Sequence, residues 1–461
     1  MLVDLLADKR DLFADGVQTV LRGQENRSRA AALLQGNLVA NTRSETRGIN
    51  ARVCKNGLYG FSSTAEYSKQ AAEMVLKAAT ENAIFLDAHC KNKKAMVPSY
   101  GIGSVALNRN IIDFEQKRII DTCKEIDDYV VKHCKNLTSR AVRYTEDSQD
   151  KIIYTSDAFS GHVTSPRAYI YVMLNAETKD GMPIDIYEAF GGAGSFEDNF
   201  SDLTYIYQGI DQIYKELMDK REGVYAEAGT KTVILGGILP GMIAHEAVGH
   251  TVEADLVLGG SVAGKNLGKQ VASEKVSLVD FAHTAFGKEA PLPIYLDDEG
   301  TKATDAVIIE NGILKGYMNN RESANHFGVT PAGNARAWLF SDEPLIRMRN
   351  TAVLPGTDKL EDMIASVEDG YYLTRTNNGQ ADLTGEFMFG VCMGYEIKKG
   401  KLGRAIFDTT VSGIAFEMLK TVDMVSDHVN WSSSGFCGKK QMIPVGMGGP
   451  ELRCQITMGG K

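Results

Sequence analysis

The chain is poor in the residues that build disulfide frameworks and zinc ribbons. Its 461 residues include 7 cysteines and 8 histidines, and no two cysteines form a Cys-x-x-Cys pair. This spacing excludes a zinc ribbon, and the odd number of cysteines favours free thiols over a disulfide-bonded scaffold. We therefore expect a cytoplasmic protein.

Long hydrophobic runs and a surplus of positive charge are also absent. No apolar stretch reaches the ~20 residues of a membrane-spanning helix. The first residues, MLVDLLADKRDLFADG, carry acidic and basic side chains from the fourth position, so we expect neither a signal peptide nor a membrane anchor. A net charge of −9 without a basic stripe makes nucleic acid an unfavourable partner.

Length and composition favour two domains. A chain of 461 residues exceeds what one core usually supports, and 43% hydrophobic residues suffice for two cores. We predict an α+β fold, with a mixed α/β N-terminal domain over residues 1–223 and a β-rich domain over residues 224–461. The second domain is expected to be a closed or sandwiched sheet, and the polar segment 221–223 marks the boundary.

The N-terminal half alternates helical and strand patterns. Asn56-Gly57 predicts a hairpin, and Ser63 can then cap a helix that runs to about Thr80. Gly191-Gly192-Ala193-Gly194 lacks the register of a phosphate-binding loop, which favours a mobile loop or a close backbone approach. Periodicity further predicts helices over 111–131 and 203–217 and strands over 143–146, 151–155, 168–175 and 184–190.

The C-terminal half reads as strands and hairpins. Asn311-Gly312 predicts a type I′ turn between 307–310 and 313–318. A second hairpin is predicted between 387–397 and 402–408. Cys454 lies in an alternating apolar run, which favours a buried core position.

The most informative segment is His245-Glu246-Ala247-Val248-Gly249-His250, because two imidazoles beside a carboxylate suit hydrolytic zinc. A random chain of this composition would contain such a set about 0.02 times. On an ideal helix, however, residues five apart lie about 140° from each other. We therefore expect a π-bulge or a wide last turn, which Gly249 can accommodate. The flanking sequence predicts a strand over 231–235, a helix start near Pro240 and a helix end at Gly259-Gly260.

A zinc ion held by two histidines and a water needs one more protein ligand. Glu253, Asp255, a distant carboxylate or a cysteine could each provide it. Among the cysteines, Cys437 has glycine neighbours that allow close backbone approach and a nearby Lys439 that favours the thiolate.

Several short motifs are spread along the chain: ARV at 51–53, GF at 60–61, HEAVGHTVEAD at 245–255, DDEG at 297–300, ENGILKGYM at 310–318, LPG at 354–356 and GFCGKKQMIPV at 435–445. In this combination they resemble the TldD/PmbA family, and specifically its TldD side, over nearly the whole chain. The resemblance implies a zinc peptidase with His245, His250 and Cys437 as ligands, and unfolded or partly degraded peptides as substrates. It also implies an enclosed cavity between two subunits and often a TldE/PmbA partner.

We accordingly predict Zn²⁺-dependent peptide hydrolysis in which Glu246 is the base for a zinc-activated water. A tyrosine, Arg336 and Arg347 are candidate donors to the oxyanion, but the sequence does not identify which of them acts. Glu253, Asp255 and Asp298 are candidates to orient a ligand imidazole or to bind substrate. For Asp298, an acidic turn at a strand end is the competing interpretation.

Two other functions remain open. The chain could be a noncatalytic subunit or peptide-binding regulator, although a structural metal site has no use for a carboxylate such as Glu246. It could also be a small-molecule amidase with the same zinc chemistry, which an open cleft rather than a narrow tunnel would favour. For assembly, we expect a homodimer or a heteromer with a PmbA/TldE-like subunit.

Overall fold

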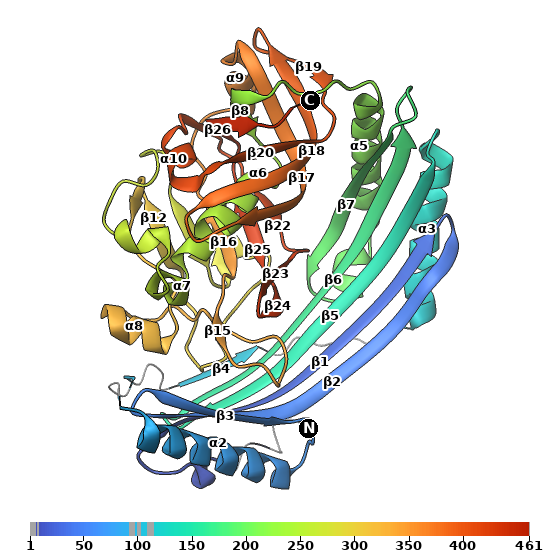
Figure 1. Ribbon diagram of the computed structural model, residues 1–461. Coiled ribbons are helices and arrows are strands. Elements are labelled where there is room, and N and C mark those ends of the chain that lie inside the picture. The colour runs from blue at the N-terminus through green and yellow to red at the C-terminus, as the bar shows by residue number, and fades with distance from the viewer. Residues whose placement is uncertain (1–5, 7–8, 92–96, 99–102, 108–114, 461) are drawn as a thin grey trace.

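The computed structural model describes residues 6, 9–91, 97–98, 103–107 and 115–460. A long curved sheet forms the N-terminal half, and a compact β-rich body lies against its concave side (Figure 1). The predicted α+β class, with a β-rich C-terminal part that includes a closed sheet, is confirmed. The division at residue 223 stays a prediction.

The N-terminal sheet has the strand order β3-β2-β1-β5-β6-β4, and β7 pairs with β6. Residues 143–146 and 151–155, predicted as two strands, belong to one long strand because the polar residues between them also pair with both neighbours. The elements of this half are η1 (Arg10–Leu12), β1 (Gln18–Leu34), β2 (Asn37–Lys55), β3 (Leu58–Thr64), α2 (Lys69–His89), β4 (Gly103–Leu107), α3 (Gln116–His133), β5 (Ser139–Thr155), β6 (Phe159–Glu177), β7 (Pro183–Ala193), α4 (Phe196–Phe200) and α5 (Thr204–Arg221).

The two faces of this sheet have different neighbours because side chains alternate along each strand. On β1, Leu21 packs in the core beneath α2, and Ala31 packs in the core beneath α3 and α5. Between them, Arg22 and Gln24 point to the other face and donate hydrogen bonds to the C-terminal body. The helices therefore cover one face, and the C-terminal body is held on the opposite one.

Two N-terminal predictions need correction. The helix predicted from Ser63 begins at Lys69, because residues 58–64 pair with β2 and Ser68 caps the helix by accepting a hydrogen bond from the Ala71 N–H. Residues 191–193 are part of β7 rather than a loop, and a Cβ on Gly191 would lie 2.1 Å from the Ala168 carbonyl oxygen. Close backbone approach therefore explains this glycine. Of the predicted helix 111–131, residues 111–114 lie outside the described residues.

The C-terminal body contains a closed sheet and an open one. Strands β17, β8, β26, β20 and β18 follow one another, and β17 also pairs with β18, which closes the barrel; the open sheet has the order β13-β12-β9-β16-β25-β22. The elements of this half are β8 (Gly229–Leu235), α6 (Leu239–Met242), the π-helical η2 (Ile243–Gly249), η3 (His250–Val252), α7 (Ala254–Leu258), η4 (Val262–Lys265), β9 (Leu278–Phe281), β10 (Thr284–Ala285), β11 (Lys288–Glu289), β12 (Ala306–Glu310), β13 (Ile313–Leu314), α8 (Arg321–Phe327), β14 (Ala335–Arg336), β15 (Leu345–Ile346), β16 (Asn350–Val353), α9 (Leu360–Ala365), β17 (Asp369–Ala381), β18 (Glu386–Lys398), β19 (Lys401–Ala405), β20 (Thr409–Ile414), α10 (Ala415–Lys420), β21 (Met424–Val425), β22 (Asn430–Ser432), β23 (Phe436–Lys439), β24 (Gln441–Pro444), β25 (Gly446–Gly449) and β26 (Leu452–Met458).

Both predicted C-terminal hairpins are present. Asn311 and Gly312 have φ of 47° and 79°, as a type I′ turn requires. The second strand of this hairpin is shorter than predicted, because Met318 leaves it to bond with Val252. The other hairpin joins β18 and β19.

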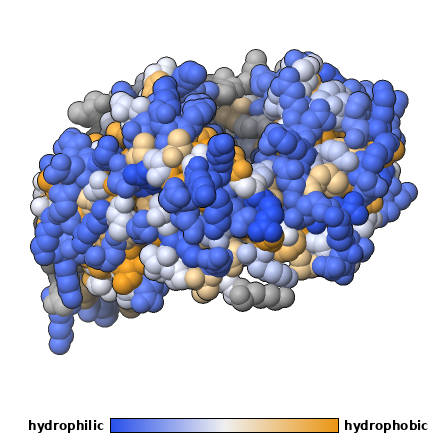
Figure 2. All heavy atoms as spheres, turned by 90° about the horizontal axis from the view of Figure 1, so that it is seen from above, coloured by the Kyte–Doolittle hydropathy of each residue, from blue (hydrophilic) through white to orange (hydrophobic). Residues whose placement is uncertain are grey.

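The surface of the molecule is mainly hydrophilic in the view of Figure 2, where hydrophobic residues lie in small groups between polar ones. The larger apolar side chains are gathered in cores under α2, under α3 and α5, and inside the C-terminal body. Within the described residues, no helix is long and apolar enough to cross a membrane.

Candidate metal centre

The segment that carries both histidines is a wide helical turn. It follows β8 and α6 and lies between the barrel and the open sheet. Residues 243–249 are π-helical, and the His250 N–H donates to the His245 carbonyl five residues earlier. The predicted widening is thus confirmed, but Gly249 has an ordinary helical φ of −53°. It allows close packing instead, since a Cβ there would lie 2.1 Å from the sulfur of the fully buried Met348, which would have to shift.

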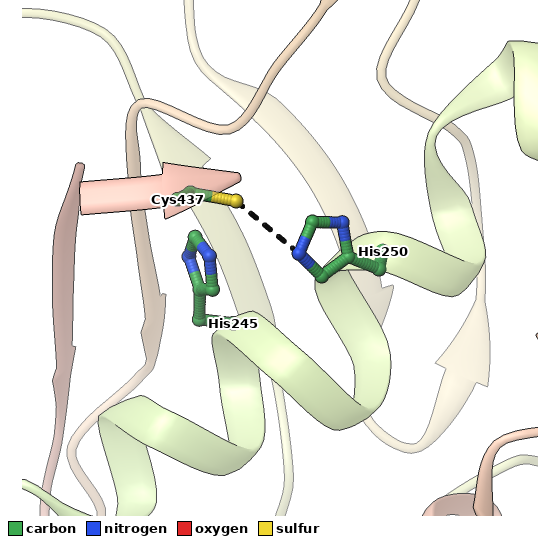
Figure 3. Close-up of side chains that lie close together, drawn as sticks. All are labelled: His245, His250 and Cys437. Carbon is green, nitrogen blue, oxygen red and sulfur yellow. Dashed lines mark hydrogen bonds between the residues drawn. The ribbon is translucent and has the colours of Figure 1, made fainter. Parts of the chain in front are cut away.

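Three side chains converge beside this turn (Figure 3). His245 and His250 come from the helical segment, and Cys437 comes from β23. Cys437 Sγ lies 3.2 Å from His250 Nε2. One ligand atom from each of the three residues lies within 4.8 Å of the others, and no further such group occurs among the residues that the structure describes.

The chemistry of these three residues fits a zinc ion. His245 is fully buried, and neither of its ring nitrogens has a hydrogen-bond partner in the described chain. A buried polar group without a partner is costly unless something else satisfies it. Burial, and next the charge of His250, lower the pKa of His245 well below 6.5, which keeps the ring in its neutral, metal-binding form. Imidazole nitrogens and cysteine thiolates are both zinc ligands, and three protein ligands plus a water are typical of catalytic zinc sites.

Glu253 orients the second imidazole. It is fully buried, and its Oε2 lies 3.1 Å from His250 Nδ1, which leaves Nε2 facing Cys437. Lys439 donates to Glu253 at 3.1 Å and to Asp255 at 2.8 Å. Because Lys439 is two residues after Cys437, these contacts join the cysteine strand to the helical segment. Neither Glu253 nor Asp255 is in the group of three ligand atoms.

Glu246 lies next to the three candidate ligands but is not one of them. Its carboxylate oxygens are 3.5 Å from His250 Nε2 and 3.9 Å from His245 Nε2, and 22% of the side chain is exposed. Burial raises the pKa of Glu246, the neighbouring Glu253 raises it further, and the charge of His250 opposes both. A carboxylate with a raised pKa is a more effective proton acceptor near neutral pH.

Asp298 has a different place in the fold. It accepts hydrogen bonds from Arg22 and Lys151 of the N-terminal sheet and from the Ala337 N–H of the C-terminal body. Burial alone would raise the pKa of Asp298, but Lys151 and Arg22 lower it. These contacts connect the two halves of the chain. The neighbouring Asp297 forms the acidic turn that the sequence predicts, by accepting from the N–H groups of Glu299 and Thr301.

The two arginines considered as oxyanion donors both donate hydrogen bonds to backbone carbonyls. Arg336 donates to Met348 and Pro444. Arg347 is fully buried and donates to the Cys437 carbonyl at 2.6 Å and to the Gln441 carbonyl at 2.9 Å. Arg347 therefore holds the cysteine strand. Sequence reasoning missed this role of Arg347. It named Lys439 as a charge near Cys437 but missed its contacts with Glu253 and Asp255, since no local pattern links residues so far apart in the chain.

Sequence models of one protein family match most of the residues of this chain. A PmbA/TldA metallopeptidase domain 1 matches residues 20–83, the central domain of that description matches residues 109–235, and its C-terminal domain matches residues 228–460. The chain belongs to the PmbA/TldD family. The resemblance seen in the sequence is thereby confirmed.

Individual relatives span nearly the whole chain. A metalloprotease of Methanocaldococcus jannaschii is 32% identical over 429 residues, which cover 89% of this chain and 90% of the relative. A zinc metalloprotease TldD homolog of Saccharolobus solfataricus is 28% identical and covers 90% of both chains. The crystal structure of TldE from Thermococcus kodakarensis superposes with a TM-score of 0.73 at 15% identity, covering 97% of this chain and 98% of that one. The last comparison concerns the fold alone.

Proposed function

We propose that the chain is a zinc-dependent peptidase that hydrolyses unfolded or partly degraded peptides. The observation that carries this proposal is the convergence of His245, His250 and Cys437, with a proton-accepting Glu246 beside them. The names of the relatives, which include metalloproteases and a zinc metalloprotease, support it.

His245, His250 and Cys437 are the residues that would hold the zinc. When bound there, zinc supplies Lewis acidity, which makes water more acidic and a peptide carbonyl more electrophilic. Glu246 takes the proton of the attacking water and returns it to the leaving amine. Glu253 keeps the His250 ring in one orientation throughout, and Arg347 and Lys439 keep the cysteine strand in place.

Substrate state provides a direct test of the peptidase proposal. Flexible peptides are expected to be cleaved, whereas a stable folded domain of similar composition is expected to stay intact. A folded domain would have to recover an unfolding free energy of about 5–15 kcal/mol from a few contacts with the enzyme. Incubation with a peptide library and with the folded domain, followed by mass spectrometry, measures both. Rapid cleavage of the folded domain would contradict the expectation.

Zinc affinity is expected to rise by about tenfold for each pH unit between pH 7 and pH 9. Burial disfavours the charged His250 ring, but hydrogen bonds to Cys437 and Glu253 outweigh burial and raise the pKa of His250 to about 10. The metal-free site therefore carries a proton that zinc must displace, so lower proton concentration favours binding. Competition with a chromophoric chelator at several pH values, corrected for the chelator, measures this slope. A flat profile would show that zinc binding releases no proton from the site.

The competing functions make different predictions. A noncatalytic regulator would bind the same peptides without cleaving them, and an amidase would cleave small amides but not the library.

For assembly, we propose a homodimer or a heteromer with a PmbA/TldE-like subunit. Membership of a family that also contains TldE supports this proposal. A cytoplasmic location belongs to the same proposal, and it is supported by the free thiols of all seven cysteines.

A further inference from the structure

The hairpin that carries Cys437 lies outside both the barrel and the open sheet. Among the residues that the structure describes, strand β23 pairs with β24 alone. An isolated two-stranded hairpin is marginally stable in water. The position of the Cys437 thiol must therefore depend on contacts from other parts of the chain.

One set of such contacts comes from the N-terminal sheet. Tyr169 donates to the Ser433 carbonyl at 2.8 Å, and its oxygen also lies 2.9 Å from Ser433 Oγ. Tyr171 donates to the Ser434 carbonyl at 3.1 Å. Since a phenol has a single proton, the Ser433 hydroxyl donates back to Tyr169. Two successive carbonyls just before β23 are thus bound by two side chains from β6.

Arg167, on the same strand, adds a third contact. Asp147 fixes its guanidinium with two hydrogen bonds of 2.7 Å. Its Nη1 lies 3.3 Å from the Ser433 carbonyl, and its guanidinium carbon lies 4.5 Å from the centre of the Phe436 ring. Arg167 therefore touches both ends of the segment 433–436, which leads directly into Cys437.

These side chains are well suited to hold a backbone segment in place. Arg167 is 3% exposed and Tyr169 is 4% exposed, so water competes little for their hydrogen bonds. Burial raises the pKa of both tyrosines, and they therefore stay protonated and keep donating. Positions 167, 169 and 171 alternate with apolar residues that pack beneath the helices, which directs all three toward the C-terminal body.

We propose that Tyr169, Tyr171 and Arg167 are positioning residues for the metal ligand Cys437, so that the N-terminal sheet is a working part of the metal centre. The inference rests on the proposed zinc site. It assigns to β6 a role beyond joining the two halves of the chain: it holds segment 433–436 so that the thiol faces His250.

The double variant Tyr169→Phe/Tyr171→Phe removes the two hydroxyls and leaves both rings in place. Tyr144→Phe is the matched control, because Tyr144 is also buried in this sheet and also donates a hydrogen bond, but to Glu146 and on the helix-covered face. The hydrogen bond of Tyr169 is buried and that of Tyr171 is partly buried. A buried hydrogen bond is worth about fivefold in an equilibrium constant, so the two losses correspond to at most about 25-fold. We expect the double variant to bind zinc at least about tenfold more weakly than the control. Cobalt substitution should also show a weaker sulfur-to-cobalt absorption band in the double variant.

A measurement on the metal-free chain separates this inference from the proposed function. Alkylation of Cys437, followed by peptide mass spectrometry, should be about tenfold faster in the double variant than in Tyr144→Phe, because the segment opens more often. If the wild type bound no zinc, the proposed function would be wrong. The alkylation rates would still test whether these side chains position Cys437, because that measurement needs no metal. Equal alkylation in the double variant and the wild type would overturn the inference, and so would an equal change in Tyr144→Phe.

Discussion

Glu246→Gln is expected to lower peptide turnover by about 10²- to 10⁴-fold while zinc binding is retained, because the amide cannot accept the proton of the attacking water. The structure supports a loss of turnover without a loss of zinc binding. Glu246 stands 3.5 Å and 3.9 Å from the two histidine nitrogens, outside the group of three ligand atoms. Steady-state cleavage of a flexible peptide, together with zinc stoichiometry on the same sample, measures both quantities.

The control for this variant is Glu417→Gln, the same chemical change on the exposed face of α10, where Glu417 pairs with Lys420. Its turnover should equal that of the wild type. Unchanged cleavage by Glu246→Gln would mean that another group activates the water. Loss of zinc from Glu246→Gln would instead give the carboxylate a role in holding the metal.

Cys437→Ala is expected to lose zinc, with an affinity at least about 10- to 100-fold below the wild type, since even indirect changes around such ligands have effects of that size. The thiol lies 3.2 Å from His250 Nε2, and its removal leaves two imidazoles to bind the metal. Zinc content after identical dialysis of wild type and variant provides the measurement.

Cys454→Ala is the matched control, because it deletes the same sulfur from another buried position. Cys454 lies on β26 in the barrel core, where burial raises the pKa of the thiol and keeps it protonated. This variant should lose only packing, about 1 kcal/mol for a small buried side chain, and should keep its zinc. Selective zinc loss from Cys454→Ala, or full retention by Cys437→Ala, would show that the wrong cysteine has been assigned.

Local patterns predicted local structure well. The wide turn followed from the five-residue spacing of His245 and His250, and the β-hairpin at Asn311-Gly312 followed from its turn chemistry. Local patterns failed to predict the full length of long strands. The polar residues 147–150 read as a turn, but they form the middle of β5 because a strand on each side satisfies their backbone groups.

In the candidate site too, the sequence predicted the neighbouring residues but not the contacts between distant ones. Both histidines and Glu246 are neighbours in the sequence, and spacing alone pointed to them. The sequence left the third ligand open until family resemblance singled out Cys437, which lies 187 residues after His250. The role of Glu253 was one of several that the sequence allowed. The contacts of Arg347, Lys439 and the β6 side chains depend on tertiary structure, and no periodicity or motif encodes them.

The distance along the chain between His250 and Cys437 also bears on how the proposed zinc site is assembled. Helices that carry two histidines four residues apart can offer both rings on one side of a single turn. Here the second ring faces a strand 187 residues later, and the chain between them contains strands of both the barrel and the open sheet. The proposed three-residue zinc site is therefore complete only when these distant segments have come together, at the entropic cost of closing a very long loop. Full zinc affinity is expected to report on the native arrangement of the C-terminal body, and not on the local helical turn alone.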